Sequence, residues 1–506
     1  MRTARKTPVL DGHSRNLAWD SLDHVDLVVI GAGVTGAGIA LDAASRGMSV
    51  VIVDKHDIAF GTSRWSSKLA HGGLRYLASL NFGIATRSAR ERGIMMEVTA
   101  PHLVHSLPQV MPVMTDSAMV HRFLPRIGFI AGDALRIAAG TSRGTLPMSR
   151  SVTAARVRDL APAVRSRGLL CGFVNYDGQL VDDARLVTAI VRTAASFGAE
   201  VLTHTSAHQV TGNSVVLHDE LGHHPDRILT AGAVVNATGV WAGDIDSSTK
   251  VRPSRGTHLI FPAEVFGNPT GALTVPVPGH VNRFCFVLPA PLGRVYLGLT
   301  DMDSPGPIPD VPEVPEEDVD FLLDVINPAL QTAVTRDDMI GSFAGLRPLI
   351  DSGDGDTADV SREHAIFTND DGVITVVGGK LTEYRLMAQQ TVDLISSETC
   401  RTKDIPLVGA GPVGKLPEGT PDWVRERYGS EAAAVVNSCA LELPLERVAD
   451  GIDVTRAEFA WAVTHEGALT VSDILDRRTR VGLVDSDRDA ALPAAEEALA
   501  LVKGAS

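Results

Sequence analysis

The sequence predicts an α/β protein with a Rossmann-like dinucleotide-binding domain, an antiparallel-sheet domain and a C-terminal helical domain. Three observations predict this class. A glycine-rich turn at residues 31–36 separates an apolar run at 26–30 from a second one at 50–53. Residues 252–299 contain several runs in which apolar and polar side chains alternate. Beyond a Gly- and Pro-rich linker at 409–419, the chain is rich in Ala, Leu and Glu. Its 506 residues suit about three domains of ~150 residues each.

The glycine-rich turn has the GxGxxG spacing of a dinucleotide-binding fingerprint, between a predicted strand and a predicted helix. Gly31 permits the tight turn, and Gly33 has no side chain that would keep a pyrophosphate away from the backbone. Gly36 lets the helix lie close to the strand, and the free N–H groups at the helix N-terminus face the phosphates. Asp54 ends the second apolar run, where its carboxylate can accept both hydroxyls of an adenosine ribose. This pattern alone does not distinguish NAD from FAD.

The elements that follow are predicted from periodicity and from turn residues. Helical spacing predicts a helix at 82–98, and an alternating run with prolines predicts an edge strand at 106–114. A helix is expected at 181–198, strand-like pieces at 201–216, and a strand that ends in VVNATG at 227–239.

The alternating runs at 252–299 indicate a mostly antiparallel sheet that can form the floor of a substrate site. The Pro-rich residues 304–315 are expected to form a surface connection, and 316–334 a helix. A third strand of the parallel type is predicted at 373–377, with a helix at 382–395 behind it. The N-terminus of that helix would favour negative charge at the same sheet edge.

Residues 61–77, GTSRWSSKLAHGGLRYL, resemble the signature of FAD-dependent glycerol-3-phosphate dehydrogenases. The resemblance continues in the family's order over about residues 25–400, and more loosely in the C-terminal hundred. The family commonly has Glu at the position of Asp54 and Ser at that of Thr257, and both replacements keep the chemistry. The further matching motifs are VDDARL at 181–186, NATG at 236–239, RGTH at 255–258, LGLTD at 297–301, GLRP at 345–348 and GGKLTEYR at 378–385.

The resemblance implies a fold and a division of the chain. The fold is an FAD-binding Rossmann-like domain of the GR2/DAO type, with an antiparallel-sheet substrate domain and a C-terminal helical domain. The expected ranges are 25–80, 150–250 and 335–400 for the FAD-binding domain, 81–149 and 251–334 for the substrate or cap domain, and 410–506 for the helical domain.

The resemblance also implies cofactor contacts after the fingerprint. Polar residues that directly follow an adenosine-binding strand favour contact with the pyrophosphate or the flavin, and the GG turn before the second helix does the same. The expected FAD-binding residues are Gly31, Gly33, Gly36, Asp54, Thr62, Ser63, Ser66, Ser67, Lys68, His71, Gly72, Gly239, Gly379 and Thr382.

The implied reaction is the oxidation of sn-glycerol 3-phosphate to dihydroxyacetone phosphate by hydride transfer to FAD. The phosphate dianion calls for cations, and an Arg fork binds phosphate oxygens bidentately. The family positions point to Arg75, Tyr76, Arg347, Lys380 and Arg385 as substrate-binding residues.

A base must take the hydroxyl proton, and neutral histidine suits that role. His258 is the first choice, and His71 is the second because its HGG turn suggests a flavin contact. Arg347 or Lys380 can instead stabilise a developing alkoxide, so His258, Arg347 and Lys380 are the predicted catalytic residues.

The resemblance implies electron transfer to a membrane quinone, with the protein at the inner face of the cell membrane. Residues 119–143 contain four arginines and one acid, Asp133, among apolar residues. Such a basic amphipathic segment can lie in a membrane interface. The alternative is an ordinary helical hairpin, since Pro125 and Gly128 argue against one long helix. A homodimer is left open.

Three other functions stay open at this point. A glycerol-3-phosphate oxidase would give the electrons to oxygen. A flavin-binding protein without turnover would act as a regulator or a scaffold. A relative that oxidises an amino acid would need a carboxylate clamp instead of a phosphate clamp.

Composition narrows the setting. The formal net charge of −15 argues against a general electrostatic attraction to nucleic acid. The four cysteines are far apart and form no CxxC, so neither a zinc site nor a disulfide framework is indicated, and a reduced cytoplasm fits. Residues 1–24 are polar and are expected to form a mobile leader. No apolar run is long enough to span a bilayer.

Two local patterns concern the C-terminal domain. Thr455 and Glu458 have capping-box spacing before a predicted helix. Arg477, Arg478 and Arg480 can aid docking or partner contacts, but a solvated face is the preferred interpretation.

Overall fold

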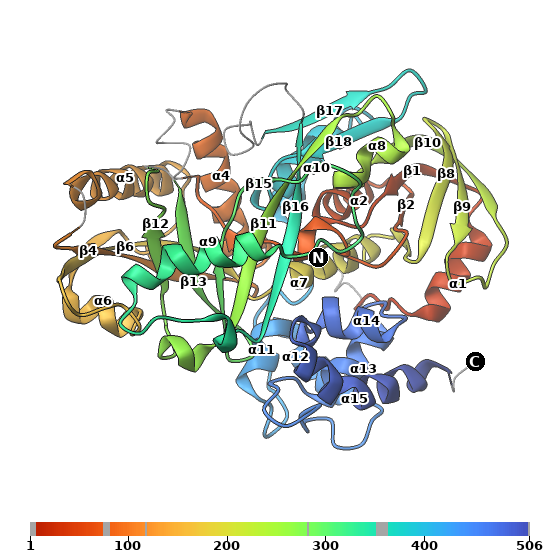
Figure 1. Cartoon of the computed structure of the whole chain (residues 1–506). Helices are drawn as coiled ribbons and strands as arrows, with labels where there is room; N and C mark the ends of the chain where they lie inside the picture. Colours follow the sequence, from red (N-terminus) through yellow and green to blue (C-terminus); the bar gives the residue numbers. More distant parts are fainter. Residues whose placement is uncertain (1–6, 74–80, 117–118, 281–282, 351–362, 504–506) are drawn as a thin grey trace.

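Figure 1 shows the computed structural model, which describes residues 7–73, 81–116, 119–280, 283–350 and 363–503. Two sheets lie side by side, and the C-terminal helices pack together at one side of the molecule (Figure 1).

The first sheet has the order β17-β18-β10-β1-β2-β7, and the hairpin β8–β9 extends it because β9 pairs with β10. Neighbouring strands from β18 to β7 run parallel. Val and Ile fill β1 and β2, which suits strands that are covered on both faces. The strands are β1 (His24–Ile30), β2 (Val50–Val53), β7 (Glu200–Leu202), β8 (Thr205–Thr211), β9 (Ser214–Asp219), β10 (Arg227–Asn236), β17 (His364–Thr368) and β18 (Ile374–Gly378).

Helix α2 (Val34–Ser45) packs against β1 and β2 and contacts both α7 (Asp183–Ala195) and α10 (Tyr384–Val392). Its small residues permit this close packing. A Cβ on Gly38 would lie 2.9 Å from the ring of Tyr384. The predicted strand–turn–helix–strand unit is therefore present, and its largest core cluster includes Leu27, Ile39 and Ile52.

The second sheet is mostly antiparallel and has the order β15-β11-β14-β13-β12-β4-β6-β3. Strand β16 pairs with β11, and β5 pairs with β6. The strands are β3 (Leu69–Ala70), β4 (Val104–Met114), β5 (Arg150–Thr153), β6 (Leu169–Leu180), β11 (Val251–Pro262), β12 (Ala272–Pro276), β13 (Phe284–Ala290), β14 (Arg294–Gly298), β15 (Met302–Asp303) and β16 (Gly341–Ile350).

Sheet membership differs from the expected division of the chain. Strands β5, β6 and β16 belong to the second sheet, although 150–250 and 335–400 were expected in the FAD-binding domain. Pairing partners far away in the sequence decide membership, and periodicity carries no information about them.

Strand β4 is an interior strand, so the edge-strand prediction is wrong. It pairs with β6 along its length and with β12 at Gln109 and Val110. Because the pairing with β12 covers only two residues, most backbone N–H groups on that side of β4 have no strand to donate to among the described residues. Pro108 and Pro112, which lack an N–H, are therefore tolerated.

Residues 119–138 form one helix, α5 (Met119–Ala138), so the hairpin prediction is also wrong. Pro125 removes one hydrogen bond, at a cost of about 3 kcal/mol. Contacts with the body of the protein stabilise the helix. Arg126 Nη1 donates to Ser149 Oγ at 2.7 Å, and Ser149 Oγ donates to Asp133 Oδ2 at 2.6 Å.

The N-terminal residues are ordered from residue 7, which corrects the leader prediction. Helix α1 (Gly12–Ser21) buries Trp19 and Arg15. The Arg15 guanidinium donates to Asp219 Oδ1 at 2.5 Å and to the Thr203 carbonyl at 2.8 Å. These partners are almost 200 residues away, so the local sequence gave no sign of them.

The remaining helices of the first two-thirds of the chain are α4 (Phe82–Ile94), α6 (Ala154–Leu160), α8 (Ala242–Ile245) and α9 (Glu316–Ile326). Helix α9 ends earlier than predicted because Pro328 follows Asn327, and the residue before a proline disfavours helix. No described helix has the combination of length and apolarity that crossing a bilayer needs.

The C-terminal helical domain has its own core around Phe459 and Trp461. The capping box at Thr455 and Glu458 is present. The helices are α11 (Asp422–Tyr428), α12 (Ala432–Asn437), α13 (Arg456–His465), α14 (Val471–Asp473) and α15 (Asp485–Lys503).

The solvated-face prediction for Arg477, Arg478 and Arg480 is wrong, because all three side chains are buried. Buried carboxylates compensate their charges. Arg478 makes two hydrogen bonds of 2.8 Å to Asp57 in the cofactor domain.

Candidate functional site

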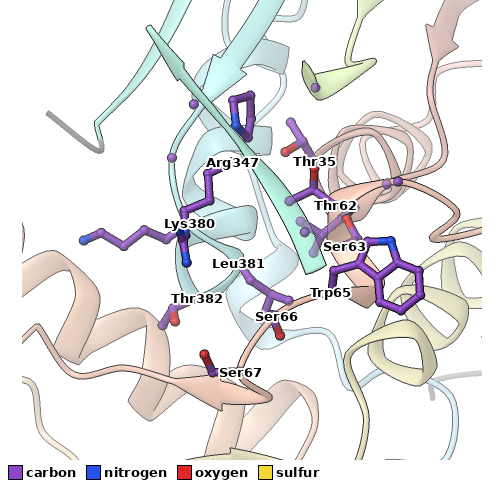
Figure 2. Close-up of a pocket in the computed structure, with 18 of the residues that line it drawn as sticks. Thr35, Thr62, Ser63, Trp65, Ser66, Ser67, Arg347, Lys380, Leu381 and Thr382 are labelled. Atoms are coloured by element: carbon purple, nitrogen blue, oxygen red, sulfur yellow. Dashed lines mark hydrogen bonds between the residues drawn. The ribbon is translucent and has the colours of Figure 1, made fainter. Parts of the chain in front are cut away.

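A cavity of about 1170 Å³ lies where the carboxyl ends of the parallel strands meet the second sheet. Gly31 after β1, Asp54 after β2 and Gly239 after β10 line one part, and Arg347 of β16 lines another. Its volume exceeds the ~300–1,000 Å³ of ordinary ligand pockets, which leaves room for a dinucleotide and a small substrate. Figure 2 shows lining residues from both sheets around this space.

The glycine turn forms the phosphate end of the cavity. Gly31 has φ +106°, and a Cβ there would lie 2.6 Å from the carbonyl oxygen of Ala237. A Cβ on Gly36 would overlap the carbonyl oxygen of Gly31. Gly33 precedes the first residue of α2 and lines the cavity, so the helix N-terminus faces it.

Asp54 lines the cavity at the end of β2. Its carboxylate accepts hydrogen bonds from the backbone N–H of Ala32 at 2.7 Å and of His56 at 2.9 Å. Burial raises the pKa of Asp54 to about 6, although these two bonds act in the opposite direction. The carboxylate therefore has acceptor capacity at neutral pH, as a ribose site requires.

The segment after the second strand places its hydroxyls at the cavity. Ser63 Oγ accepts from the N–H of Val34 at 2.8 Å, and Thr62 Oγ1 donates to the Leu346 carbonyl at 2.6 Å. Ser66 Oγ donates to Asp183 Oδ2 at 2.7 Å. Thr62, Ser63 and Ser66 line the cavity together with Ser67 (Figure 2).

Lys68 does not line this cavity. Its buried Nζ lies 2.7 Å from Asp183 Oδ2 and donates to the Arg64 carbonyl at 2.8 Å. The structure therefore places Lys68 behind the segment it was expected to serve, where it supports Ser66 through their shared carboxylate.

A second glycine turn, at Gly378 and Gly379, lines another part of the cavity. Gly378 and Gly379 have φ +81° and +79° and bring the chain from β18 to α10. Gly379 and Thr382 line the cavity, as does Gly239 with φ +63° after β10.

Two of the expected cations face the cavity. Arg347 Nη1 lies 3.1 Å from Asp301 Oδ1 and 3.3 Å from Ser254 Oγ. Lys380 Nζ lies 3.0 Å from Ser88 Oγ and 3.2 Å from Glu383 Oε1. Both line the cavity (Figure 2): Arg347 lies in β16 of the second sheet, and Lys380 in the turn that follows β18 of the first.

Of the other expected substrate residues, the structure describes Arg385, which lies away from this place. Arg385 is buried in an ion pair with Glu91, with contacts of 2.5 and 2.7 Å, and does not line the cavity. Arg75 and Tyr76 lie outside the described residues.

His258 lies behind the cavity wall. Its side chain is fully buried, its ring stacks on Phe343 with the ring centres 4.7 Å apart, and its Nε2 is 3.1 Å from Ser67 Oγ. Burial, with the charges of Lys68 and Arg347, lowers the pKa of His258 well below its ordinary value. Ser67, and not the imidazole, reaches the cavity.

His71 does line the cavity, and its side chain is half exposed. Its Nδ1 lies 3.1 Å from Asp177 Oδ2, and Gly72 donates its N–H to Asp177 Oδ1 at 3.1 Å. Burial would raise the pKa of Asp177, but the charge of Arg92 and the bond from His71 outweigh it, so the pKa is lowered. The result is a histidine oriented by a buried carboxylate.

The sequence did not reveal the carboxylates behind the site. Asp183 lies in the VDDARL motif, which was noted without a role for its acids, and Asp177 has no sequence signal at all. In the structure Asp177 and Asp183 are buried, and each is hydrogen-bonded to a site residue.

The residues present fit FAD. The glycine turns leave backbone open where a Cβ would collide, Asp54 retains acceptor capacity, and the volume suits a large cofactor. Within the described residues, no group of three or more His, Cys, Asp or Glu side chains could hold a metal ion.

Residues 26–385 match the family model of FAD dependent oxidoreductases, and residues 400–505 match that of the C-terminal domain of alpha-glycerophosphate oxidase. The chain therefore belongs to the FAD dependent oxidoreductases, and its cofactor is FAD.

Within that family the chain belongs with the glycerol-3-phosphate dehydrogenases. It is 58% identical over 489 residues to glycerol-3-phosphate dehydrogenase 1 of Mycobacterium bovis and of Mycobacterium tuberculosis, with 94% of this chain and 95% of the relative covered. These matches confirm the predicted family, fold class and cofactor.

Two solved structures show the same fold. The glycerol-3-phosphate dehydrogenase from Bacillus halodurans, complexed with FAD, has a TM-score of 0.72 and 26% identity, covering 96% of this chain and 94% of that chain. The L-alpha-glycerophosphate oxidase from Mycoplasma pneumoniae, with FAD bound, has a TM-score of 0.57 and 14% identity, covering 76% of this chain and 99% of that one.

Proposed function

We propose that this protein oxidises sn-glycerol 3-phosphate to dihydroxyacetone phosphate. The observation that carries the proposal is the pair Arg347 and Lys380, which line the cofactor cavity from β16 and from the turn after β18. A phosphate dianion needs such cations. The names of the mycobacterial relatives support the same substrate. When bound, FAD supplies the hydride acceptor.

The two cations have different roles in this proposal. Asp301, Ser254 and the Thr300 carbonyl hold the Arg347 guanidinium by hydrogen bonds of 3.1 to 3.3 Å, so its fork is oriented before substrate arrives. Lys380 is a compact charge that Ser88 and Glu383 hold in place. Arg347 suits bidentate binding of the phosphate, and Lys380 suits stabilisation of an alkoxide.

For the base, the geometry favours His71 over the first choice from the sequence, His258. A base must reach the proton directly or through one water, and His71 lines the cavity. Asp177 can orient its imidazole and stabilise the imidazolium that forms. A proton on His258 would lie in a buried place near two cations, Lys68 and Arg347. We propose that His258 instead positions Ser67.

The test of the proposed substrate is an anaerobic titration of the purified holoprotein. Glycerol 3-phosphate should bleach the flavin absorbance, whereas glycerol and amino acids should not. Bleaching by an amino acid but not by glycerol 3-phosphate would contradict the phosphate clamp. No bleaching by any of these compounds would favour a flavin-binding protein without turnover.

For the electron acceptor we propose a membrane quinone. Helix α5 supports this choice, because Ile127 and Phe129 line the cavity, and Ile127, Ile130 and Ile137 of the same helix are more than half exposed. A helix with an exposed apolar stripe can lie in a membrane interface. Ile127, which is exposed in that stripe and also lines the cavity, would give an apolar acceptor a way to the cavity. The protein would then sit at the inner face of the cell membrane.

The second candidate is a glycerol-3-phosphate oxidase, which the match of residues 400–505 to an oxidase C-terminal domain favours. Oxygen-electrode traces with glycerol 3-phosphate distinguish the two functions. A dehydrogenase should consume little oxygen until a quinone analogue is added. Rapid oxygen consumption with formation of peroxide would identify the oxidase.

A further inference from the structure

Residues 55–65 directly follow Asp54 and include the hydroxyl residues Thr62 and Ser63. We call this segment the cofactor loop. Seven of its eleven residues line the cavity. Its own backbone hydrogen bonds are local: the N–H of Phe60 donates to the Asp57 carbonyl at 3.1 Å, and that of Trp65 to the Thr62 carbonyl at 3.0 Å. The side of the loop away from the cavity contacts the C-terminal domain, more than 400 residues further along the chain.

Asp57 is the centre of this contact. Its carboxylate is fully buried. Arg478 binds it with both terminal nitrogens at 2.8 Å, and Arg477 Nε adds a bond of 2.6 Å. Asp57 lies three residues after Asp54, so the C-terminal arginines hold the chain directly beside the ribose position.

The same arginines reach further along the loop. The Arg477 guanidinium lies 5.5 Å from the ring centre of Phe60, a cavity residue. Arg480 donates to the Arg64 carbonyl at 2.8 Å, and its guanidinium lies 5.1 Å from the ring centre of Trp65. The contacts therefore extend from residue 57 to residue 65.

A second connection runs through His204, at the turn between β7 and β8. Its Nε2 lies 3.1 Å from Asp473 Oδ2, and Asp473 also pairs with Arg477 at 2.5 Å. The backbone N–H of His204 donates to the His56 carbonyl at 2.5 Å. The cofactor loop is thus held at His56 and at Asp57 by one cluster of buried charges.

We propose that the C-terminal helical domain retains the FAD by fixing the cofactor loop, with Arg478 and Arg477 as positioning residues. The inference rests on FAD as the cofactor and not on the proposed substrate. A buried carboxylate that loses one of its two cations, as Asp57 would without Arg478, is destabilised where it lies. Asp57 would then move toward water, and the loop would take Asp54 and Ser63 away from their places at the cavity.

The experiment measures FAD affinity of the full-length chain after removal of one arginine. Arg478→Met is the test variant. Arg427→Met is the matched control, because Arg427 is also buried in a 2.7 Å ion pair, with Glu458, but that pair lies wholly within the C-terminal domain. The apoprotein of each variant is titrated with FAD, and the Kd and the FAD dissociation rate are recorded beside the Tm of the apoprotein.

Arg478→Met should raise the Kd for FAD at least about 10-fold, a factor that corresponds to about 1.4 kcal/mol. Arg427→Met should change it less than about 3-fold, although both variants lower the Tm of the apoprotein. The double variant Arg478→Met with Asp57→Asn should recover part of the affinity, because a neutral amide then replaces the buried carboxylate that lost Arg478, and Arg477 keeps Asp473 as its partner.

Equal Kd values for Arg478→Met and the wild type would overturn the proposal, as would an equal loss of affinity in both single variants. If Arg478→Met does not fold, Arg478→Lys replaces it, since it keeps the charge and loses only the paired geometry. The same comparison then applies. Glycerol 3-phosphate is absent from these titrations, so their outcome is independent of the proposed reaction.

Discussion

The assignment of the base to His71 can be tested by His71→Gln. The substitution removes the imidazole but keeps a side chain that can hydrogen-bond to Asp177. In the structure His71 Nδ1 is held at 3.1 Å from Asp177 Oδ2, so only the other ring nitrogen is available for a substrate proton. Glutamine has no group that takes up a proton near neutral pH, and its amide cannot replace that nitrogen.

General-base catalysis contributes about 10²–10⁴-fold, or about 3–5 kcal/mol of activation free energy. The structure favours the lower end. At an effective dielectric of about 20, the attraction between an imidazolium and Asp177 is about 5 kcal/mol at this distance. However, Arg92 already lies 2.6 Å from the same carboxylate, and water reaches the half-exposed ring. We therefore expect a loss of about 10²-fold.

The assay is single-turnover bleaching of the flavin by glycerol 3-phosphate in a stopped-flow instrument, at saturating substrate and over a range of pH. Flavin content is measured first, because His71 is also a predicted cofactor contact. His258→Gln, the comparison variant, should lose less than about 10-fold. A near-wild-type rate for His71→Gln together with a loss of about 10² for His258→Gln would refute the reasoning and return the base role to His258 acting through Ser67.

Four further outcomes are expected. Arg347→Lys keeps the charge but loses the fork, so kcat/KM for glycerol 3-phosphate should fall about 10–10²-fold, and an unchanged value would remove Arg347 from the clamp. Gly36→Ala should yield protein with little bound FAD, at a stability cost of about 1–3 kcal/mol, whereas Gly414→Ala, where a Cβ meets nothing within 4 Å, should be neutral. Burial alone would lower the pKa of His204, but Asp473 raises it above the unfolded value. Its contribution to stability is therefore present below about pH 6.5 and lost as the pH rises through the folded pKa, and His204→Gln should lower the Tm more at about pH 6 than at about pH 8.5. Ile130→Ser with Ile137→Ser, or Arg122→Glu with Arg126→Glu, should lower the fraction that pellets with membranes, and an unchanged fraction in both would exclude α5 as the contact.

Local patterns were sufficient for the cofactor end of the site. The positive φ of Gly31 and the close approach of Gly36 to the Gly31 carbonyl arise within a single strand–turn–helix unit, so the spacing of the glycines predicts them. The same holds for Thr455 and Glu458, whose bonds close within three residues. The resemblance added the order of the remaining motifs.

Other features depend on distant partners and could not be predicted in this way. Three neighbouring arginines normally form a solvated face, but Arg477 and Arg478 are buried against Asp57, which lies 420 residues away in the sequence. The burial of a side chain also cannot be predicted from a local sequence motif. His258 and His71 both lie in family motifs, yet one is fully buried and the other is half exposed.

The parallel pairing of β10 with β18 has a consequence for synthesis of the chain. Val235 and Asn236 find their partners, Ile374 and Thr375, only after a further 140 or so residues have left the ribosome. Until then that part of β10 is an open edge, which is prone to wrong pairing in a nascent chain. Premature termination before residue 374 should therefore yield insoluble fragments, even where the whole glycine turn has been made.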